Sequence, residues 1–347
     1  MNAPLNLRPS SPWALCQYDP GASRQTRKGH YESFFVRANH PSEPRGFWIR
    51  YTVFQSRQGD ERSTVGELWA IYFDATGEST RVVTVQQDVP MEQCSFQSGT
   101  SSLAVGGATW EKGRLKGECR LDDNRIEWDL AHQDGQGELL LLPDYLYGAP
   151  LPKAKSMVIA PNVRFRGQLS VNGGSVNVDG WQGSENHNWG SKHTDEYAWG
   201  QVAGFDNAPD AFFEVATARI KLGPIWSPPM TLGVLRLGGR EYRFNTLRQA
   251  FANDGHYDYF DWRFALDNGG ATLKGRIHGD RSAFTGLNYK NPPGGLHTCL
   301  NSKIASCELT LEVPGQPPVE LVTRSRAAFE ILTDDTGHGV EIQNPDS

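Results

Sequence analysis

The sequence has 347 residues, enough for one large or two medium β domains that bury a full core without disulfide bonds. Its 34 Lys and Arg residues against 40 Asp and Glu residues give a formal net charge of -6, the wrong sign for a phosphate-binding surface, so nucleic acid is not an expected partner. The 5 cysteines are scattered and form no CxxC pair, which argues against a disulfide framework and a thiolate zinc site and favours reduced thiols in a cytoplasmic protein.

The first segment, residues 1–14, has no continuous apolar stretch behind a basic start, so we expect a disordered leader and no secretory signal. Apolar runs such as residues 139–142 are far too short for a bilayer, which needs roughly 20 residues. No transmembrane segment is therefore expected.

Alternation of apolar and polar residues predicts β-strands along nearly the whole chain. In residues 46–54, for example, the side chains of Phe47, Ile49 and Tyr51 share one face. The pattern recurs in two further segments of the first half, residues 66–74 and 125–130.

The alternation stops between Pro143 and Pro161, where repeated prolines prevent ladder hydrogen bonding. We place a domain boundary here, with an N-terminal β domain at residues 15–150 and a C-terminal β domain at residues 151–347.

In the second half, residues 163–171 alternate and are followed by Asn172-Gly173, a strong tight-turn signal that predicts a hairpin. Further strands are predicted at residues 197–204, 211–220, 231–237, 259–266, 271–278 and 306–313. Helix is predicted only at residues 325–332. Two long sets of antiparallel strands predict an all-β fold with little helix, built as two curled sheets or barrels packed together.

Polar and aromatic groups are densest in residues 179–206, where glycines let the backbone bend or approach a ligand. The candidate catalytic residues here are His187 and Tyr197, and the candidate substrate-binding residues are Trp181, Asn186, Trp189, Trp199 and Gln201. The alternative interpretation is a β-bulge or turn whose polar side chains satisfy buried backbone groups while the tryptophans belong to the core.

Glu214 is the third candidate catalytic residue, because it shares a predicted strand face with Phe212 and Ala216. Burial among apolar groups raises the pKa of a carboxyl group and allows it to donate a proton near neutral pH. The alternative is a structural carboxylate neutralised by a cation or a hydrogen bond. For Glu32 and Arg50, mutual pairing across neighbouring strands is the favoured interpretation.

Other kinds of chemistry have little support in the sequence. His187 and His193 lack HExxH spacing and no carboxylate completes a metal site, so no metal is expected. The sequence has no GxSxG nucleophile elbow, no Walker loop and no GxGxxG after a strand, so neither covalent catalysis nor a nucleotide cofactor is expected.

At residues 181–190 the chain resembles the carotenoid hydratase (hydroxyneurosporene synthase) and attachment-protein-like superfamily, whose marker is the His-Asn-Trp-Gly of the segment WQGSENHNWG. The superfamily includes kievitone hydratase, tocopherol cyclase-like proteins and fungal Diels-Alder cyclases. Looser similarity covers both halves, at ESFFVR (residues 32–37), FWIRYT (47–52) and GELWAIYFD (66–74). The resemblance implies tandem lipocalin-like β-barrels with an apolar ligand cavity.

The resemblance also implies an enzyme of isoprenoid or polyketide secondary metabolism that works without a cofactor, either a hydratase (hydro-lyase) or a cyclase. In the carotenoid hydratases the proposed acid is an aspartate on the strand after the motif, and the similar position here is Glu214. Those hydratases carry Asp directly before the motif histidine, whereas this chain has Asn186, which removes a charge near His187 and counts against hydration in particular.

These observations lead to the hypothesis that an apolar small molecule binds while Glu214 or His187 protonates an alkene or activates a hydroxyl group. Aromatic faces of Trp181, Trp189, Trp199 or Tyr197 would stabilise a developing cation. The alternative is a non-catalytic carrier of a lipid or pigment. A surface or attachment factor ranks last, because it requires an export signal. The substrate, the acid among the two candidates and the oligomeric state stay open at the level of sequence.

Overall fold

The computed structural model describes residues 16–19, 21–57, 64–96, 102–133 and 135–344. The leader expected at residues 1–14 lies outside the described residues.

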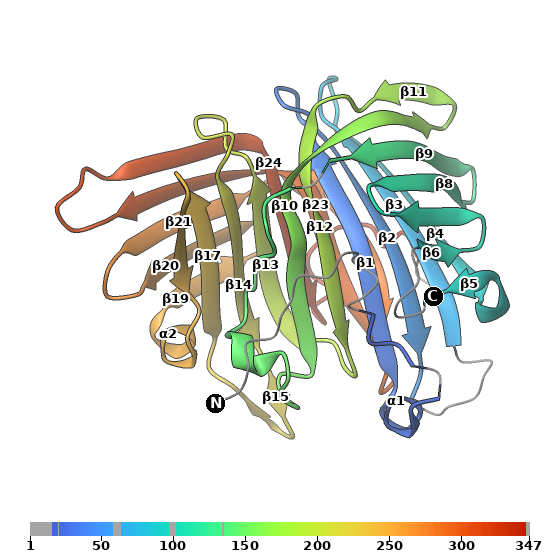
Figure 1. The fold of residues 1–347 in the computed structure, drawn as a ribbon, viewed down its shortest axis with the longest axis horizontal. Coiled ribbons are helices and arrows are strands. Elements are labelled where there is room, and N and C mark those ends of the chain that lie inside the picture. Colours follow the sequence, from blue (N-terminus) through green and yellow to red (C-terminus); the bar gives the residue numbers. More distant parts are fainter. Residues whose placement is uncertain (1–15, 20, 58–63, 97–101, 134, 345–347) are drawn as a thin grey trace.

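Two large antiparallel sheets stand side by side and make up nearly all of the described chain (Figure 1). The first is a 12-stranded sheet with the order β4-β3-β2-β1-β12-β10-β9-β8-β7-β6-β5 and with β11 paired to β10. The second is a 10-stranded sheet with the order β18-β17-β14-β13-β24-β23-β21-β20-β19 and with β22 paired to β23. This arrangement confirms the predicted all-β fold of two packed, lipocalin-like sheets.

The strands of the first sheet are β1 (His30–Asn39), β2 (Arg45–Gln55), β3 (Thr64–Asp74), β4 (Arg81–Pro90), β5 (Cys94–Ser95), β6 (Ser102–Val105), β7 (Ala108–Glu111), β8 (Arg114–Leu121), β9 (Asn124–His132), β10 (Ala154–Val171), β11 (Gly174–Asn177) and β12 (Trp181–Gly190). Those of the second sheet are β13 (Glu196–Ala203), β14 (Phe212–Arg219), β17 (Met230–Leu237), β18 (Arg240–Phe244), β19 (Asp254–Asp258), β20 (Asp261–Asp267), β21 (Thr272–His278), β22 (Thr285–Lys290), β23 (Leu296–Glu312) and β24 (Val319–Thr333). A separate hairpin joins β15 (Lys221–Leu222) to β16 (Ile225–Trp226), and the helices are α1 (Ser23–Lys28) and α2 (Leu247–Ala252).

The tight turn after β10 follows the sequence signal. Asn172 has a φ of 51° and Gly173 a φ of 83°, the left-handed conformations that a two-residue hairpin turn requires. The turn joins β10 to β11 in the predicted hairpin.

The helix predicted at residues 325–332 is wrong, because this segment is the end of the strand β24. Residues 326–332 are buried throughout, and the strand pairs with β13 on one side and β23 on the other. Ladder hydrogen bonds and burial on both faces outweigh the helix propensity of Arg326-Ala327-Ala328.

Sheet membership changes between Gly190 and Glu196, later in the chain than the domain boundary predicted at residue 150. The proline-rich segment connects β9 to β10, which pair with each other in the first sheet. β10 also begins earlier than predicted, at Ala154, and passes Pro161 through register shifts against β12, since a bulge tolerates the missing N–H.

Each sheet curls around an apolar core of its own, and further apolar clusters fill the space between the sheets. The larger of these, here called the inter-sheet cluster, contains Phe35, Trp48, Trp69, Ile71, Phe73, Ala283, Leu287, Tyr289, Cys299, Ile304 and Leu332. The two sheets are therefore joined by a continuous buried layer, and the residues of this layer can position a site.

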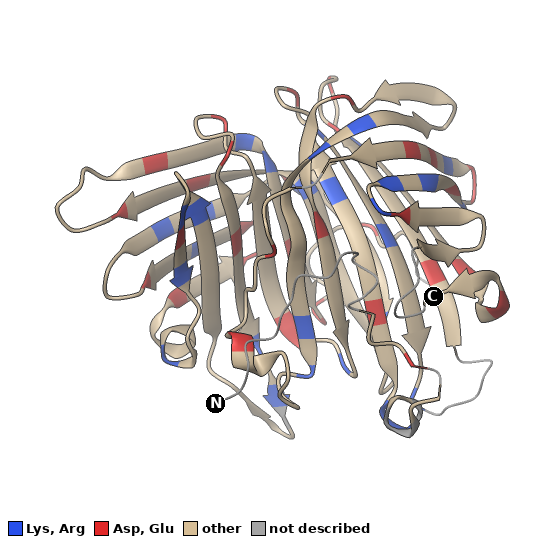
Figure 2. Cartoon of the chain, in the orientation of Figure 1, with Lys and Arg blue, Asp and Glu red and all other residues tan. Residues whose placement is uncertain are grey.

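Charged residues of both signs are interspersed over both sheets in the view of Figure 2. In the described part of the chain, no helix has the length and apolar character needed to span a membrane.

Candidate active site between the two sheets

Strand β12 presents its side chains to two different environments, because successive residues of a strand point to opposite faces. Trp181 belongs to the core of the first sheet, and His187 stacks on Phe34 of the same core. Ser184 and Asn186 face the other way and contact β13 of the second sheet. The His-Asn-Trp-Gly segment is thus divided between a core and the inter-sheet layer.

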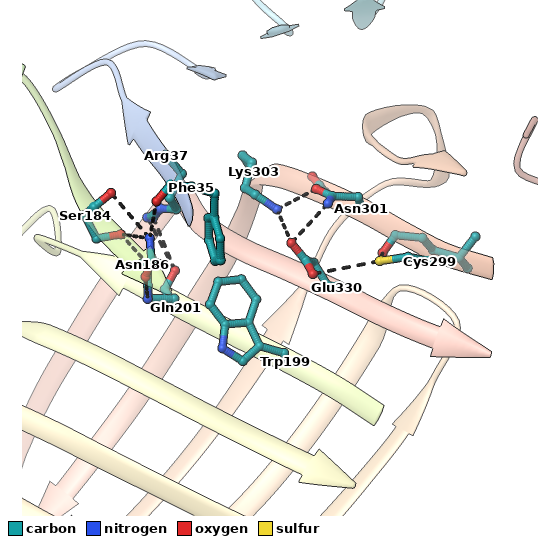
Figure 3. Close-up of polar contacts among 12 residues, drawn as sticks. Phe35, Arg37, Ser184, Asn186, Trp199, Gln201, Cys299, Asn301, Lys303 and Glu330 are labelled. Atoms are coloured by element: carbon teal, nitrogen blue, oxygen red, sulfur yellow. Dashed lines mark hydrogen bonds and ion pairs between the residues drawn. The ribbon is translucent and has the colours of Figure 1, made fainter. Parts of the chain in front are cut away.

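A buried amide network crosses from β12 to β13 (Figure 3). The Ser184 hydroxyl donates to Gln201 Oε1 at 2.6 Å, and Gln201 Nε2 donates to Asn186 Oδ1 at 2.8 Å. Asn186 Nδ2 in turn donates to Ser184 Oγ at 2.9 Å. The Asn186 amide therefore donates and accepts at once, which an ionised aspartate at this position does not do.

Glu214 lies at the second-sheet end of this network, on β14. Its Oε1 accepts hydrogen bonds from Trp199 Nε1 at 3.0 Å and from Gln201 Nε2 at 3.4 Å, whereas its Oε2 has no hydrogen-bond partner among the described residues. The residue is 2% exposed, and burial raises the pKa of Glu214 to about 7 despite the two hydrogen bonds. A carboxyl group in this state exchanges a proton near neutral pH.

Tyr197 and Trp199 stand on the same face of β13 as Gln201. Burial raises the pKa of Tyr197 well above its ordinary value, so its phenol stays neutral. The Trp199 ring packs edge-on against Phe35, with 6.4 Å between ring centroids, and this contact fixes the indole that donates to Glu214.

A second polar cluster, which sequence reasoning missed, lies beside Trp199 (Figure 3). Lys303 on β23 is fully buried and its Nζ forms an ion pair of 2.7 Å with Glu330 on β24. The Nζ also lies 5.6 Å from the ring centroid of Trp48 and 5.8 Å from that of Trp199. Burial lowers the pKa of Lys303, and Glu330 opposes this shift. Lysine in an alternating strand reads as solvent-exposed, so its pattern in the sequence gave no signal.

His187 occupies a different site, inside the core of the first sheet. Its Nε2 lies 2.7 Å from Glu32 Oε1, and its ring is stacked between Phe34 and Trp189 at 4.3 Å and 4.4 Å. Burial alone raises the pKa of Glu32, but hydrogen bonds and charge from His187 and His30 lower it to about 2. The structure does not bring His187 together with Glu214, because His187 points into the core of the first sheet, whereas Glu214 belongs to the second sheet and faces the layer between the sheets.

The pairing of Glu32 with Arg50 is also wrong. In the register of β1 and β2, Glu32 faces Val53 and Arg50 faces Phe35, which places the two side chains on opposite faces of the sheet. Glu32 is instead held by the histidines and by the backbone N–H groups of residues 17 and 18.

The other two predicted tryptophans, Trp181 and Trp189, lie on β12 of the first sheet. Trp181 contributes to the wall of an open cleft of about 450 Å³ at one end of the first sheet, together with His40, Arg45 and Asp74. Trp189 packs between His187 and Tyr147. Among the described residues, no group of three or more His, Cys, Asp or Glu side chains is placed to hold a metal ion. Asn186, Tyr197, Trp199, Gln201 and Glu214 are thus the predicted site residues that the fold gathers in the inter-sheet layer.

Comparison with known proteins gives distant matches in sequence and matches of fold among solved structures. No protein-family model matches the chain. Uncharacterized proteins from two strains of Mycobacterium tuberculosis are 23% identical over 214 residues, which is 62% of this chain and 63% of each relative's length.

Three solved structures share the fold. An AttH-like protein from Nitrosomonas europaea superimposes with a TM-score of 0.55 and 14% identity, over 90% of this chain and 94% of its own. Kievitone hydratase from Nectria haematococca superimposes with a TM-score of 0.54 and 11% identity, over 89% of this chain and 90% of its own. CghA, solved with Sch210972, superimposes with a TM-score of 0.54 and 12% identity, over 90% of each chain. The chain therefore has the fold of the superfamily that its His-Asn-Trp-Gly segment resembles.

Proposed function

We propose that this protein is an enzyme that performs acid/base chemistry on an apolar small molecule between the two sheets, as a hydratase or a cyclase, with Glu214 as the proton donor. The chemistry requires no cofactor in this proposal, because the proton comes from a protein side chain. The kievitone hydratase and CghA structures support it by sharing the fold.

The state of the Glu214 carboxyl group is the observation that carries the proposal. The group is buried, its pKa is raised to about 7, and one of its oxygens is not engaged by any described residue. A structural carboxylate in a core is paired with a cation or fully hydrogen-bonded. A neutral carboxyl group with a free oxygen is instead the arrangement of a general acid.

The proposed reaction begins when protonated Glu214 transfers its proton to one carbon of a substrate alkene. The indole of Trp199 holds the resulting carboxylate, and the aromatic faces of Trp199 and Trp48 stabilise the positive charge on the other alkene carbon. In a hydratase, water then adds to that carbon and its proton returns to Glu214. In a cyclase, the oxygen of a hydroxyl group of the same substrate adds to that carbon and closes a ring, and the hydroxyl proton returns to Glu214. His187 takes no part in this proton path, and Tyr197 supplies a neutral phenol to the same inter-sheet layer.

The test uses the purified protein with a panel of isoprenoid and polyketide-type polyenes in deuterium oxide, with products analysed by mass spectrometry. The native protein is expected to introduce one solvent deuterium at carbon in a substrate of the panel. In Glu214→Gln the rate should fall at least ~100-fold, the lower end of the contribution of a general acid. Glu196→Gln, on the neighbouring strand β13, is the matched control and should keep the native rate.

An unchanged rate in Glu214→Gln would refute the acid role. Binding of panel members by the native protein without any incorporation of deuterium would favour the carrier instead.

A further inference from the structure

Arg50 is a buried cation whose terminal nitrogens have no hydrogen-bond or ion-pair partner among the described residues, although Glu67, on the same face of the first sheet, lies near enough for the two charges to attract each other. It lies on β2, faces the second sheet and is 4% exposed. Its Nε donates to Ser33 Oγ at 2.9 Å. Among the residues that the structure describes, its two terminal nitrogens form no hydrogen bond and no ion pair with a carboxylate. Four N–H donors of a guanidinium are thus left for another acceptor.

Other buried cations between the sheets do have partners. Lys303 is paired with Glu330, and Lys290 lies 3.5 Å from Glu67. Arg37 donates to the carbonyl oxygens of Gln201 and Arg326. Arg50 differs from these cations because its terminal N–H donors have no acceptor among the described residues, which leaves them available to a ligand of opposite charge.

Two aromatic rings hold the Arg50 guanidinium in place. Its central carbon lies 4.6 Å from the ring centroid of Tyr289 and 5.9 Å from that of Trp48. A guanidinium that lies over aromatic rings keeps the N–H donors of its planar edge available to another acceptor. That edge has the spacing to bind both oxygens of a carboxylate.

Arg50 and Glu214 belong to one continuous set of contacts. Trp48 contacts both Arg50 and Lys303, Lys303 contacts Trp199, and Trp199 donates to Glu214. The acid therefore lies at one end of this layer and the unpaired cation at the other, with the aromatic rings between them.

We propose that Arg50 binds a carboxylate carried by the apolar substrate, which fixes the end of the molecule remote from the reacting carbon. The substrate class is then an isoprenoid- or polyketide-like acid rather than a neutral hydrocarbon. The position of the substrate carboxylate relative to Glu214 rests on the proposed function. The binding of a carboxylate at Arg50 does not require turnover.

The experiment compares ligands that share one isoprenoid body and differ in the head group: all-trans-retinoate, all-trans-retinol and retinyl phosphate. Binding is followed by quenching of tryptophan fluorescence. The native protein is expected to bind retinoate at least tenfold more tightly than retinol, and at least as tightly as retinyl phosphate. Arg50→Met should bind the acid and the alcohol equally. Arg45→Met, the same substitution on the same strand at a partly exposed ion pair, should keep the native preference.

Three results would overturn the inference: equal binding of retinoate and retinol by the native protein, a preference that survives in Arg50→Met, or a preference lost in Arg45→Met. The last would place the carboxylate in the open cleft near Trp181. Tighter binding of retinyl phosphate would overturn the assignment of the carboxylate.

Thermal unfolding separates ligand binding from a structural role. Without ligand, Arg50→Met should unfold at the same or a higher temperature than the native protein, and retinoate should stabilise the native protein but not the variant. If Arg50→Met does not fold, the inference is wrong, because a structural cation is then required. Arg50→Lys keeps the positive charge but lacks the paired N–H donors of the guanidinium, and should retain part of the preference for retinoate over retinol.

The same binding measurements on Glu214→Gln distinguish this inference from the proposed function. A retained preference for retinoate in a variant without activity supports Arg50 as the anchor whatever reaction Glu214 performs. Turnover of neutral substrates at equal rates by the native protein and Arg50→Met would leave the acid role intact and remove the anchor.

Discussion

Burial sets the protonation state of Glu214, and with it the pH range in which the proposed acid is active. The folded pKa of about 7 lies above the ordinary value of 4.5, so the folded protein holds this proton more tightly than the unfolded chain. The side chain is 2% exposed, so solvent weakens this shift little. Residue-level chemistry at the site is therefore coupled to the stability of the fold.

The stability contributed by the Glu214 proton should be fully present below pH 4.5 and lost as the pH rises through 7. The difference between a pKa of 4.5 and one of about 7 corresponds to roughly 3 kcal/mol of stability. Urea unfolding at pH 5 and pH 8 should therefore show the native protein losing stability relative to Glu214→Gln across this interval. Turnover should decline over the same pH range, because the proposed acid loses its proton. A constant difference in stability between the two proteins would mean that Glu214 is ionised throughout.

The Glu32–His187 pair should behave in the opposite way. The folded pKa of Glu32, at about 2, lies below 4.5, so its contribution is present above pH 4.5 and is lost as the pH falls towards 2. His187→Phe keeps a ring between Phe34 and Trp189 but removes the contact with Glu32, and should cost about 3 kcal/mol of unfolding free energy.

The double variant with Glu32→Gln should lose less than the sum of the single losses, because both substitutions break the same contact. Unfolding of His187→Phe at the native denaturant midpoint would show that the pair contributes nothing to stability.

For single residues, the sequence predicted burial correctly where the neighbours on the same face of one strand determine the environment of the side chain. Glu214 was predicted to be buried from Phe212 and Ala216 on its own strand, and it is. Arg50 and Lys303 were not predicted as site residues, because their surroundings come from the facing sheet and alternation along one strand contains no information about it. The site as a whole stays a prediction until the variants are measured.

At the scale of elements, strand positions follow from alternation and turns, whereas partners do not. β2, β3 and β9 begin and end within two residues of their predicted segments. β1 pairs with β12 across more than 140 residues of intervening sequence, and no local pattern specifies that neighbour. The segment of β24 shows the limit of local propensity, since its partners on both sides determine its conformation.

Close approach of β1 and β12 explains a glycine that local geometry does not require. A Cβ atom on Gly183 would lie 1.8 Å from the carbonyl oxygen of Arg37. Gly183→Ala should therefore separate the two strands and cost at least about 2 kcal/mol, measured by thermal unfolding. Gly107→Ala is the control, because nothing lies within 4 Å of its added Cβ. Equal melting of both variants would show that β12 shifts freely against β1.

At the scale of the whole molecule, the inter-sheet cluster makes the two sheets one cooperative unit. Phe73 is fully buried in it. Phe73→Ala should lower the unfolding free energy by about 3–5 kcal/mol, with amide exchange accelerated in β3 and in β23 alike. Leu296→Ala, at a side chain that is 44% exposed, serves as the control. Faster exchange confined to β3 would mean that the sheets unfold independently.

The order in which the strands pair has a consequence for how the chain folds as it is synthesised. β1 can pair with β12 only after β12 has been synthesised. In the same way β13, the first strand of the second sheet, can pair with β24 only after that last strand of the sheet has been synthesised. The edges of β1 and β13 stay open while most of their sheets emerge, and such edges recruit strands of other chains. Closure of these long loops makes folding slow. The yield of folded protein on expression should therefore change more with temperature and with added chaperones than the free energy of unfolding of the purified protein does.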